Sequence, residues 1–124
     1  FLKGTKPVLW SPYTTRDYTY VGDVAKGYAR VGENGKSNEV YHFSSGKETS
    51  MREMLNIIAK SIGIDKIDVE WKSDRPQDFS RSSGDSSKAR NELGWQPKVS
   101  LEDGMKRTVE WWKSHPELWN LKYK

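Results

Sequence analysis

Residues 39–63 have the sequence EVYHFSSGKETSMREMLNIIAKSIG, which joins the clearest predicted strand of the chain to its clearest predicted helix. Residues 39–44 are rich in β-forming side chains and are followed by a glycine, which predicts a strand. Ser50 and Glu53 have the spacing of a capping box, and apolar side chains then recur at helical spacing up to Gly63. A strand directly followed by an amphipathic helix is typical of an α/β fold.

The patterns on either side of this stretch are weaker. They predict an irregular segment over 1–15, a strand over 17–21, a helix from Val24 to Gly32, a strand over 67–71, a serine-rich loop over 73–87, a short helix capped by Asp85 that ends near Gly94, and a last helix that begins at Ser100 and stops before Pro116. The sequence therefore predicts one mixed α/β domain over residues 1–124, with about four helices and two or three short strands.

Composition narrows the functional classes. The chain has 124 residues and a net charge of +4, a length that fits a single domain. It contains no cysteine, which excludes disulfides, a thiolate nucleophile and cysteine-based zinc sites, and which predicts a reducing, cytoplasmic compartment. No apolar run approaches the roughly 18 residues that a membrane span requires, so we expect no membrane partner.

Several site classes find no support in the residue pattern. The histidines His42 and His115 lie far apart, and neither has a carboxylate at metal-ligand spacing. Gly22, Gly27 and Gly32 recur inside one predicted helix and do not form a dinucleotide-binding turn. No serine lies in a Gly-x-Ser-x-Gly elbow. We therefore predict no metal site, no cofactor-phosphate loop and no serine-based triad in this chain.

Two loop arginines are candidates for anion binding. Arg16 immediately precedes the predicted strand at 17–21, and Arg75 begins the sequence Arg-Pro-Gln-Asp in the serine-rich loop. Guanidinium groups are planar, permanently charged donors that match phosphate oxygens, so two that converge would suit a diphosphate. The alternative is that both are solvated surface charges, or that they form ion pairs with Asp17 and Asp78, and spacing alone leaves this open.

A nucleic-acid partner is the competing reading of a basic chain with 15 aromatic residues. The basic residues are interspersed with 17 acidic ones, and no run of five or six like charges occurs. Trp111 and Trp112 are predicted to lie on a buried face of the last helix. We therefore regard nucleic acid as the weaker candidate partner.

Four stretches, taken in order, carry a family resemblance. They are RDYTYVGDVA at 16–25, EVYHFSSGKETS at 39–50, RPQD at 75–78 and DSSKARNELGWQPKVSLEDG at 85–104. Together the chain resembles the C-terminal, substrate-binding part of the extended short-chain dehydrogenase/reductase family, the NAD(P)-dependent sugar-nucleotide epimerases and dehydratases. Two positions depart from the family pattern: Gln77 replaces the commoner glycine of the Arg-Pro-Gly-Asp form, and Gly22 stands where an acidic residue is frequent.

The resemblance implies roles for particular residues. Arg16 and Arg75 are expected to contact the diphosphate of a nucleotide-sugar substrate, and Asp78 is expected to accept hydrogen bonds from its ribose. Asp23 is expected to be a helix N-terminal charge rather than a ligand. Trp95 is expected to pack beneath the last helix.

The resemblance also implies what this chain lacks. The family binds NAD(P) in an N-terminal Rossmann domain and uses a Tyr-x-x-x-Lys pair as acid and base. No tyrosine here has a lysine four residues later. We expect NAD(P) in a longer parent enzyme, and for this chain alone neither cofactor binding nor catalysis. Apolar surface left exposed by the missing Rossmann domain predicts self-association. A non-catalytic nucleotide or nucleic-acid binding module, and a structural interaction domain, remain the alternatives.

Overall fold

The computed structural model of the chain describes residues 2–73 and 77–120. Its elements, in chain order, are β1 (Val8–Trp10), β2 (Thr15–Asp17), α1 (Val21–Asn34), β3 (Glu48–Ser50), α2 (Met51–Ile62), β4 (Glu70–Lys72), β5 (Arg81–Ser82), α3 (Ser87–Leu93), α4 (Leu101–Ser114) and the 3-10 turn η1 (Pro116–Asn120). The mixed α/β class and the four helices are confirmed. The described part of the chain has five very short strands, more than the two or three that we predicted.

The strands form two small sheets. β1 pairs with β4 in parallel, while β2 lies between antiparallel β3 and parallel β5. In this register Arg16 is opposite Thr49 on one side and Ser82 on the other. Residues from three distant parts of the sequence therefore meet around Arg16.

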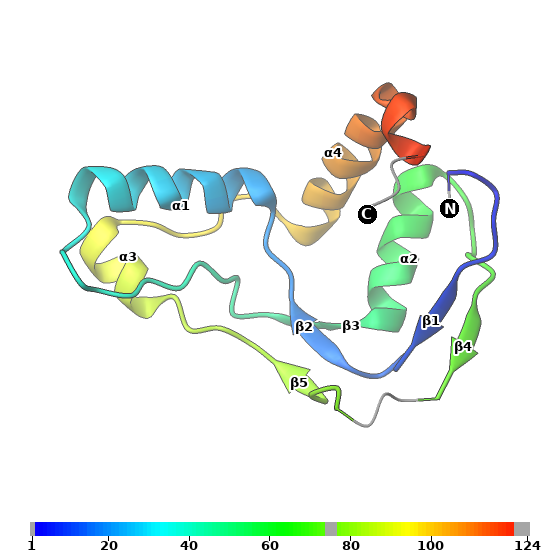
Figure 1. The fold of residues 1–124 in the computed structure, drawn as a ribbon, viewed down its shortest axis with the longest axis horizontal. Coiled ribbons are helices and arrows are strands. Elements are labelled where there is room, and N and C mark those ends of the chain that lie inside the picture. The colour runs from blue at the N-terminus through cyan, green and yellow to red at the C-terminus, as the bar shows by residue number, and fades with distance from the viewer. Residues whose placement is uncertain (1, 74–76, 121–124) are drawn as a thin grey trace.

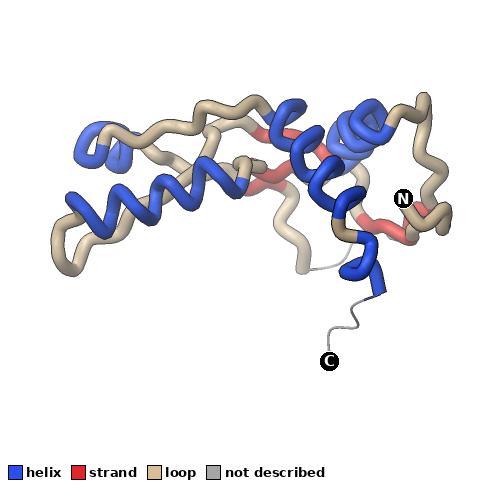
Figure 2. Tube along the Cα trace, turned by 90° about the horizontal axis from the view of Figure 1, so that it is seen from above, coloured by secondary structure: helices blue, strands red, loops and turns tan. Residues whose placement is uncertain are grey.

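The molecule is elongated, with helices at both ends and the three-stranded sheet between them. Figure 1 shows α1 and α3 at one end, and α2, α4 and the β1–β4 pair at the other. The view from above in Figure 2 shows the same separation. α2 packs against α4. The three-stranded sheet thus lies where the chain crosses between the two ends.

Helix α2 forms as predicted. The Ser50 hydroxyl accepts from the Glu53 amide, and the Glu53 carboxylate accepts from the Ser50 amide at 2.8 Å, which completes the capping box. The helix ends at Gly63, whose φ of 85° is the left-handed conformation that glycine adopts at low cost. Met54 and Leu55 are buried on its inner face.

Helix α1 is longer than predicted and begins closer to β2. The strand predicted over 17–21 is wrong, because β2 ends at Asp17 and the helix starts at Val21. The Asp23 carboxylate, in the first turn, accepts from the amides of Lys98 and Val99 at 2.8 Å each. These long-range bonds hold the start of the helix in place, and no local sequence pattern predicts them.

The strand predicted over 39–44 is also wrong. The segment belongs to no sheet, and among the described residues no backbone–backbone hydrogen bond involves residues 40–44. β3 forms instead at 48–50, where β2 offers a partner. A β-rich composition describes side-chain fit to a sheet, and a strand forms only where a second strand is available.

Smaller differences have the same cause. β1 lies in the segment that was predicted to be irregular and β2 begins at its last residue, Thr15; β4 is shifted toward the C-terminus, and β5 interrupts the serine-rich loop. The predicted capping residue Asp85 accepts from the Ser87 amide at 2.8 Å, but the N-cap position is Ser86. The shifts of the strands follow from pairing with distant segments.

The buried aromatic cluster lies at the α1–α3 end. Trp95 is 4% exposed and packs with Ala89 and Leu93 against Phe43, whose ring centroid is 4.8 Å away. Its indole Nε1 donates to the Asp23 carbonyl at 2.8 Å. Trp95 is therefore buried as predicted, but among α1, α3 and residue 43 rather than beneath the last helix.

The predicted burial of Trp111 and Trp112 is wrong. Their side chains are 48% and 36% exposed, because α4 turns its Val109 side inward. Helical spacing places Trp112 near that face, but Trp111 stacks instead on His115, with ring centroids 4.3 Å apart.

Candidate functional site

Arg16 and Asp78 lie side by side beside the three-stranded sheet. Arg16 Nη1 donates to the carbonyls of Thr15 and Phe79, at 2.8 Å each, and Nη2 lies 4.0 Å from Asp78 Oδ1. The two side chains are 31% and 35% exposed. The guanidinium is thus oriented by backbone carbonyls, while one of its nitrogens faces a carboxylate that solvent can reach.

Asp78 has a second partner in the turn that joins β1 to β2. Ser11 Oγ donates to Asp78 Oδ2 at 3.4 Å. The Ser11 carbonyl accepts from the amide of Thr14 at 3.2 Å and from its hydroxyl at 2.9 Å, which closes the turn just before Arg16. The two carboxylate oxygens of Asp78 therefore face different groups.

Asp17 connects three segments next to the site, because it lies on β2 and accepts hydrogen bonds from residues 45–46 and from Gly84. Its carboxylate accepts from the amides of Ser45 at 2.9 Å, Gly46 at 2.8 Å and Gly84 at 3.4 Å, and from the Ser45 hydroxyl. Burial raises the pKa of Asp17, but these hydrogen bonds outweigh burial and hold the pKa below its ordinary value. Asp17 is therefore not the ion-pair partner of Arg16 that the sequence left open.

A second polar cluster joins all three strands of the sheet. The Arg81 guanidinium on β5 donates to both Glu48 oxygens on β3, at 2.6 and 3.0 Å, and the Thr15 hydroxyl on β2 also donates to Glu48. The bonds from Arg81 and Thr15 lower the pKa of Glu48 to about 2. Because β5 has only two residues, this bidentate pair helps to keep the Asp78 segment against β2.

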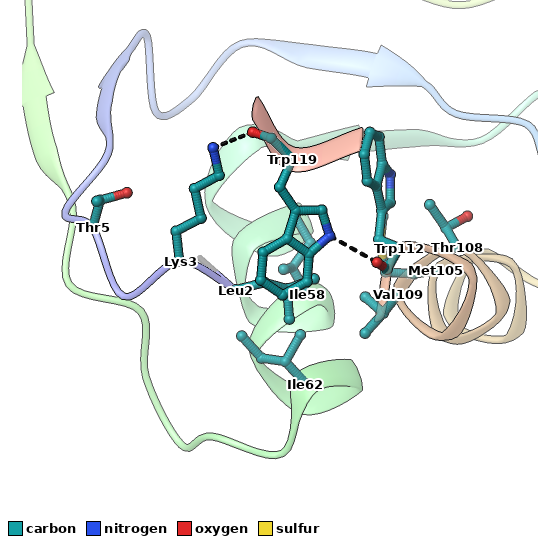
Figure 3. A pocket seen from close by; sticks show the side chains of 10 residues that line it. All are labelled: Leu2, Lys3, Thr5, Ile58, Ile62, Met105, Thr108, Val109, Trp112 and Trp119. Atoms are coloured by element: carbon teal, nitrogen blue, oxygen red, sulfur yellow. Dashed lines mark hydrogen bonds between the residues drawn. The ribbon is translucent and has the colours of Figure 1, made fainter. Parts of the chain in front are cut away.

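The two principal hollows lie elsewhere. One, of about 750 Å³, lies between the β2–α1 connection, α2 and the start of α4. The other, of about 390 Å³, is mainly apolar and lies between the N-terminal segment, α2, α4 and η1 (Figure 3). Arg16 and Asp78 line neither of them. The candidate site is an open face beside the sheet and not an enclosed cavity.

The described residues contain neither a candidate metal site nor a candidate membrane-spanning helix. Within 2–73 and 77–120 there is no group of three or more His, Cys, Asp or Glu side chains that could hold a metal ion. The same residues include no helix long and apolar enough to cross a membrane.

The structure brings together two of the three predicted site residues. Arg16 and Asp78 meet as described above, and Arg75 lies outside the described residues. Sequence analysis missed Ser11, Glu48 and Arg81, because their contacts join segments that are far apart in the chain and no local spacing marks them.

A family model matches most of the chain. Residues 3–108 match the model described as GDP-mannose 4,6 dehydratase. Among curated relatives, the UDP-glucose 4-epimerase of Mycolicibacterium smegmatis is 37% identical over 81% of this chain and 32% of its own length. The dTDP-glucose 4,6-dehydratase of Streptomyces niveus is 34% identical over 91% of this chain and 34% of its own length. The chain thus spans about a third of the relatives that it matches.

Solved structures agree with this relationship. The dTDP-glucose 4,6-dehydratase DesIV of Streptomyces venezuelae, solved with NAD bound, superposes with a TM-score of 0.86 and 33% identity over 96% of this chain and 37% of its own. The UDP-glucose 4-epimerase of Thermotoga maritima, solved with UDP-glucose, gives a TM-score of 0.84 and 35% identity over 93% of this chain and 37% of its own. The chain belongs to the GDP-mannose 4,6 dehydratase family, within the extended short-chain dehydrogenase/reductase sugar-nucleotide epimerases and dehydratases.

Proposed function

We propose that this chain binds the nucleotide diphosphate part of a sugar-nucleotide substrate, with Arg16 on the diphosphate and Asp78 on the ribose. The observation that carries the proposal is the meeting of these two side chains at 4.0 Å from distant parts of the sequence. A guanidinium offers paired, charged donors to phosphate oxygens, and a carboxylate accepts from a ribose diol. Arg75, three residues before Asp78, is proposed as the second diphosphate ligand.

The contacts of Arg16 would allow a diphosphate to replace Asp78 as its partner. Its Nη1 is held by two backbone carbonyls, so the plane of the guanidinium is fixed before a ligand arrives. Its pairing with Asp78 is long, at 4.0 Å, and each side chain is about one-third exposed. A long ion pair that solvent can reach contributes little stability, so a diphosphate can replace it at small cost.

We further propose that the chain acts as one part of a larger NAD(P)-dependent epimerase or dehydratase. Its own glycines do not fit a dinucleotide site, because Gly22, Gly27 and Gly32 lie within α1 and not in a strand-to-helix turn. When present in the larger enzyme, NAD(P) would accept a hydride from the sugar. The residues of this chain hold the nucleotide end of the substrate, and we expect no turnover from the 124 residues alone.

Exposed apolar side chains support the proposal that another domain packs against this chain. On α1, Val21 and Tyr28 are 71% and 70% exposed and share one face with the exposed Ala25. After α1, Val40 is 69% exposed in the segment 39–44, which pairs with no strand among the described residues. We propose that these exposed apolar residues, Val21, Ala25 and Tyr28 on α1 together with Val40 in the segment that follows it, pack against the cofactor-binding part of the enzyme.

Nucleotide titration of the isotopically labelled chain tests the ligand. UDP, dTDP and GDP should shift the amide signals around Arg16 and Asp78, and a single-stranded oligonucleotide should not. Arg16→Met should weaken nucleotide affinity about tenfold or more, because it removes a charge-assisted contact. Arg30→Met is the matched control, since Arg30 is an exposed arginine on the far end of α1. Unchanged nucleotide affinity in Arg16→Met, or tighter binding of the oligonucleotide, contradicts the proposal.

Sedimentation tests the docking surface. We expect the chain to self-associate through its exposed apolar surface, and the double variant Val40→Ser with Tyr28→Ser to shift toward monomer. Ile64→Ser is the control, because Ile64 is 43% exposed at the opposite end of the molecule. A well-folded chain that is monomeric at all concentrations would count against this surface.

A further inference from the structure

Ser11 has an unusual backbone conformation for a serine. Its φ is 53°, in the left-handed region, where a side chain crowds the following carbonyl. The other described non-glycine residue with positive φ is Asn38, at 61°, and asparagine tolerates this region better than serine does. Glycine would adopt the conformation at position 11 without steric cost. A serine there calls for a reason beyond the shape of the turn.

The Ser11 side chain supplies that reason. The residue is 1% exposed, so its hydroxyl is withdrawn from water and needs a partner within the protein. That partner is Asp78, whose Oδ2 accepts at 3.4 Å. Glycine would ease the turn but would leave Asp78 without this donor.

The contact also sets the direction of the carboxylate. Oδ1 of Asp78 faces Arg16 at 4.0 Å, and Oδ2 faces Ser11. A hydroxyl contact of 3.4 Å is longer than the usual 2.7–2.8 Å, so it is a weak hydrogen bond that occupies at most one lone pair of Oδ2. The remaining lone pairs of Oδ2 stay available for a ligand hydroxyl.

We propose that Ser11 is a positioning residue for Asp78, held in a left-handed turn so that its hydroxyl aims the carboxylate at the ribose of a bound nucleotide. This inference rests on the proposed function, because it takes Asp78 as the ribose acceptor. Ser11 itself need not touch the nucleotide. Its effect should appear with ligands that carry a ribose and be absent with those that do not.

Two variants separate the effect of Ser11 on the orientation of Asp78 from its effect on the stability of the fold. Ser11→Gly and Ser11→Ala both remove the hydroxyl, but only glycine relieves the left-handed backbone. The glycine variant should therefore melt several degrees above the alanine variant. Both should bind UDP a few-fold more weakly than the unchanged chain, at most the effect of losing one ordinary hydrogen bond, because the contact to Asp78 is long. Both should bind inorganic pyrophosphate as the unchanged chain does, because pyrophosphate has no ribose.

Two controls complete the experiment. Asn38→Gly changes another left-handed position at the far end of the molecule and should leave UDP affinity unchanged. In an Asp78→Asn background, Ser11→Gly should cause no further loss of UDP affinity, since the carboxylate that it aims is gone.

The outcomes distinguish this inference from the function on which it rests. UDP affinity of Ser11→Gly equal to that of the unchanged chain, or UDP affinity that follows melting temperature across the two variants, overturns the role of Ser11. An equal loss of pyrophosphate affinity also overturns it. If the unchanged chain binds neither UDP nor pyrophosphate, the proposed function itself fails.

Discussion

The Trp95 region and the Arg16 region differ in burial and in how closely their polar groups are bonded. Trp95 is 4% exposed, its indole has a partner in the Asp23 carbonyl, and rings surround it. Arg16 and Asp78 are about one-third exposed, and their mutual contact is 4.0 Å. Burial with full hydrogen bonding gives a rigid packed core, whereas partial exposure with long contacts leaves groups free to change partners. The first region stabilises the fold, and the second is where we propose that a ligand binds.

The largest expected effect is in the aromatic cluster. Trp95→Ala should destabilise the chain by about 3–5 kcal/mol, because it leaves a cavity and removes the donor to the Asp23 carbonyl. That loss is a large share of the stability of a small domain. Trp111→Ala, at a half-exposed ring, should cost less than about 1 kcal/mol. Urea denaturation of both variants measures the difference, and equal losses would show that burial does not explain the stability of the Trp95 region.

Asp23 should follow as the next largest effect. Asp23→Ala should cost about 1–3 kcal/mol, because the partly buried amides of Lys98 and Val99 lose their acceptor. Asp23→Asn keeps an acceptor oxygen and should cost clearly less. Thermal unfolding of the pair tests this order. A result in which asparagine is as damaging as alanine would show that charge, and not hydrogen bonding, fixes the start of α1.

Acid should affect stability through the same groups. For Asp23, burial raises the pKa, but bonds from Val99, Lys98 and Lys26 outweigh it, so the pKa, like that of Asp17, lies below its ordinary value. A carboxyl whose pKa is lowered by folding stabilises the native state above its unfolded pKa of about 3.9, and this contribution is lost as pH falls through the folded pKa.

Urea midpoints should therefore be nearly flat between about pH 7 and 5 and decline below about pH 4. Asp17→Asn should decline less steeply, because one of the linked groups is removed. A midpoint that rises as pH falls would contradict the signs given for both carboxyls.

The smallest effect is expected at the Glu48–Arg81 pair on the surface of the sheet. Arg81→Gln should lower the melting temperature only slightly, since Arg81 is 77% exposed. It should still weaken nucleotide binding, because β5 holds the segment that carries Asp78. The exchanged pair Glu48→Arg with Arg81→Glu should restore part of the binding. Nucleotide affinity that is unaffected by Arg81→Gln would limit this pair to the fold alone.

Local chemistry was sufficient for part of the fold. The capping box of Ser50 and Glu53, the left-handed Gly63 and the Ser100 cap predicted α2 and the start of α4, because caps and helix periodicity act over a few residues. The family motifs likewise placed Arg16 and Asp78 in the candidate site, and the structure brings those two residues together.

Strand positions could not be predicted in this way. Residues 39–44 have the composition of a strand but no partner among the described residues, and β3 forms at 48–50, where β2 lies within reach. The exposed Trp111 was missed for a related reason, since helical spacing shows that a face is apolar and not which neighbour covers it.

The sequence by itself determined the helices, the family and the identity of the charged residues, because these depend on short-range periodicity and ordered motifs. Only the tertiary structure decided which strands pair, that Asp17 fastens the chain crossings, and that Ser11 faces Asp78. Hydrogen bonds between segments more than 60 residues apart depend on the three-dimensional path of the chain, and no local pattern of side chains encodes that path.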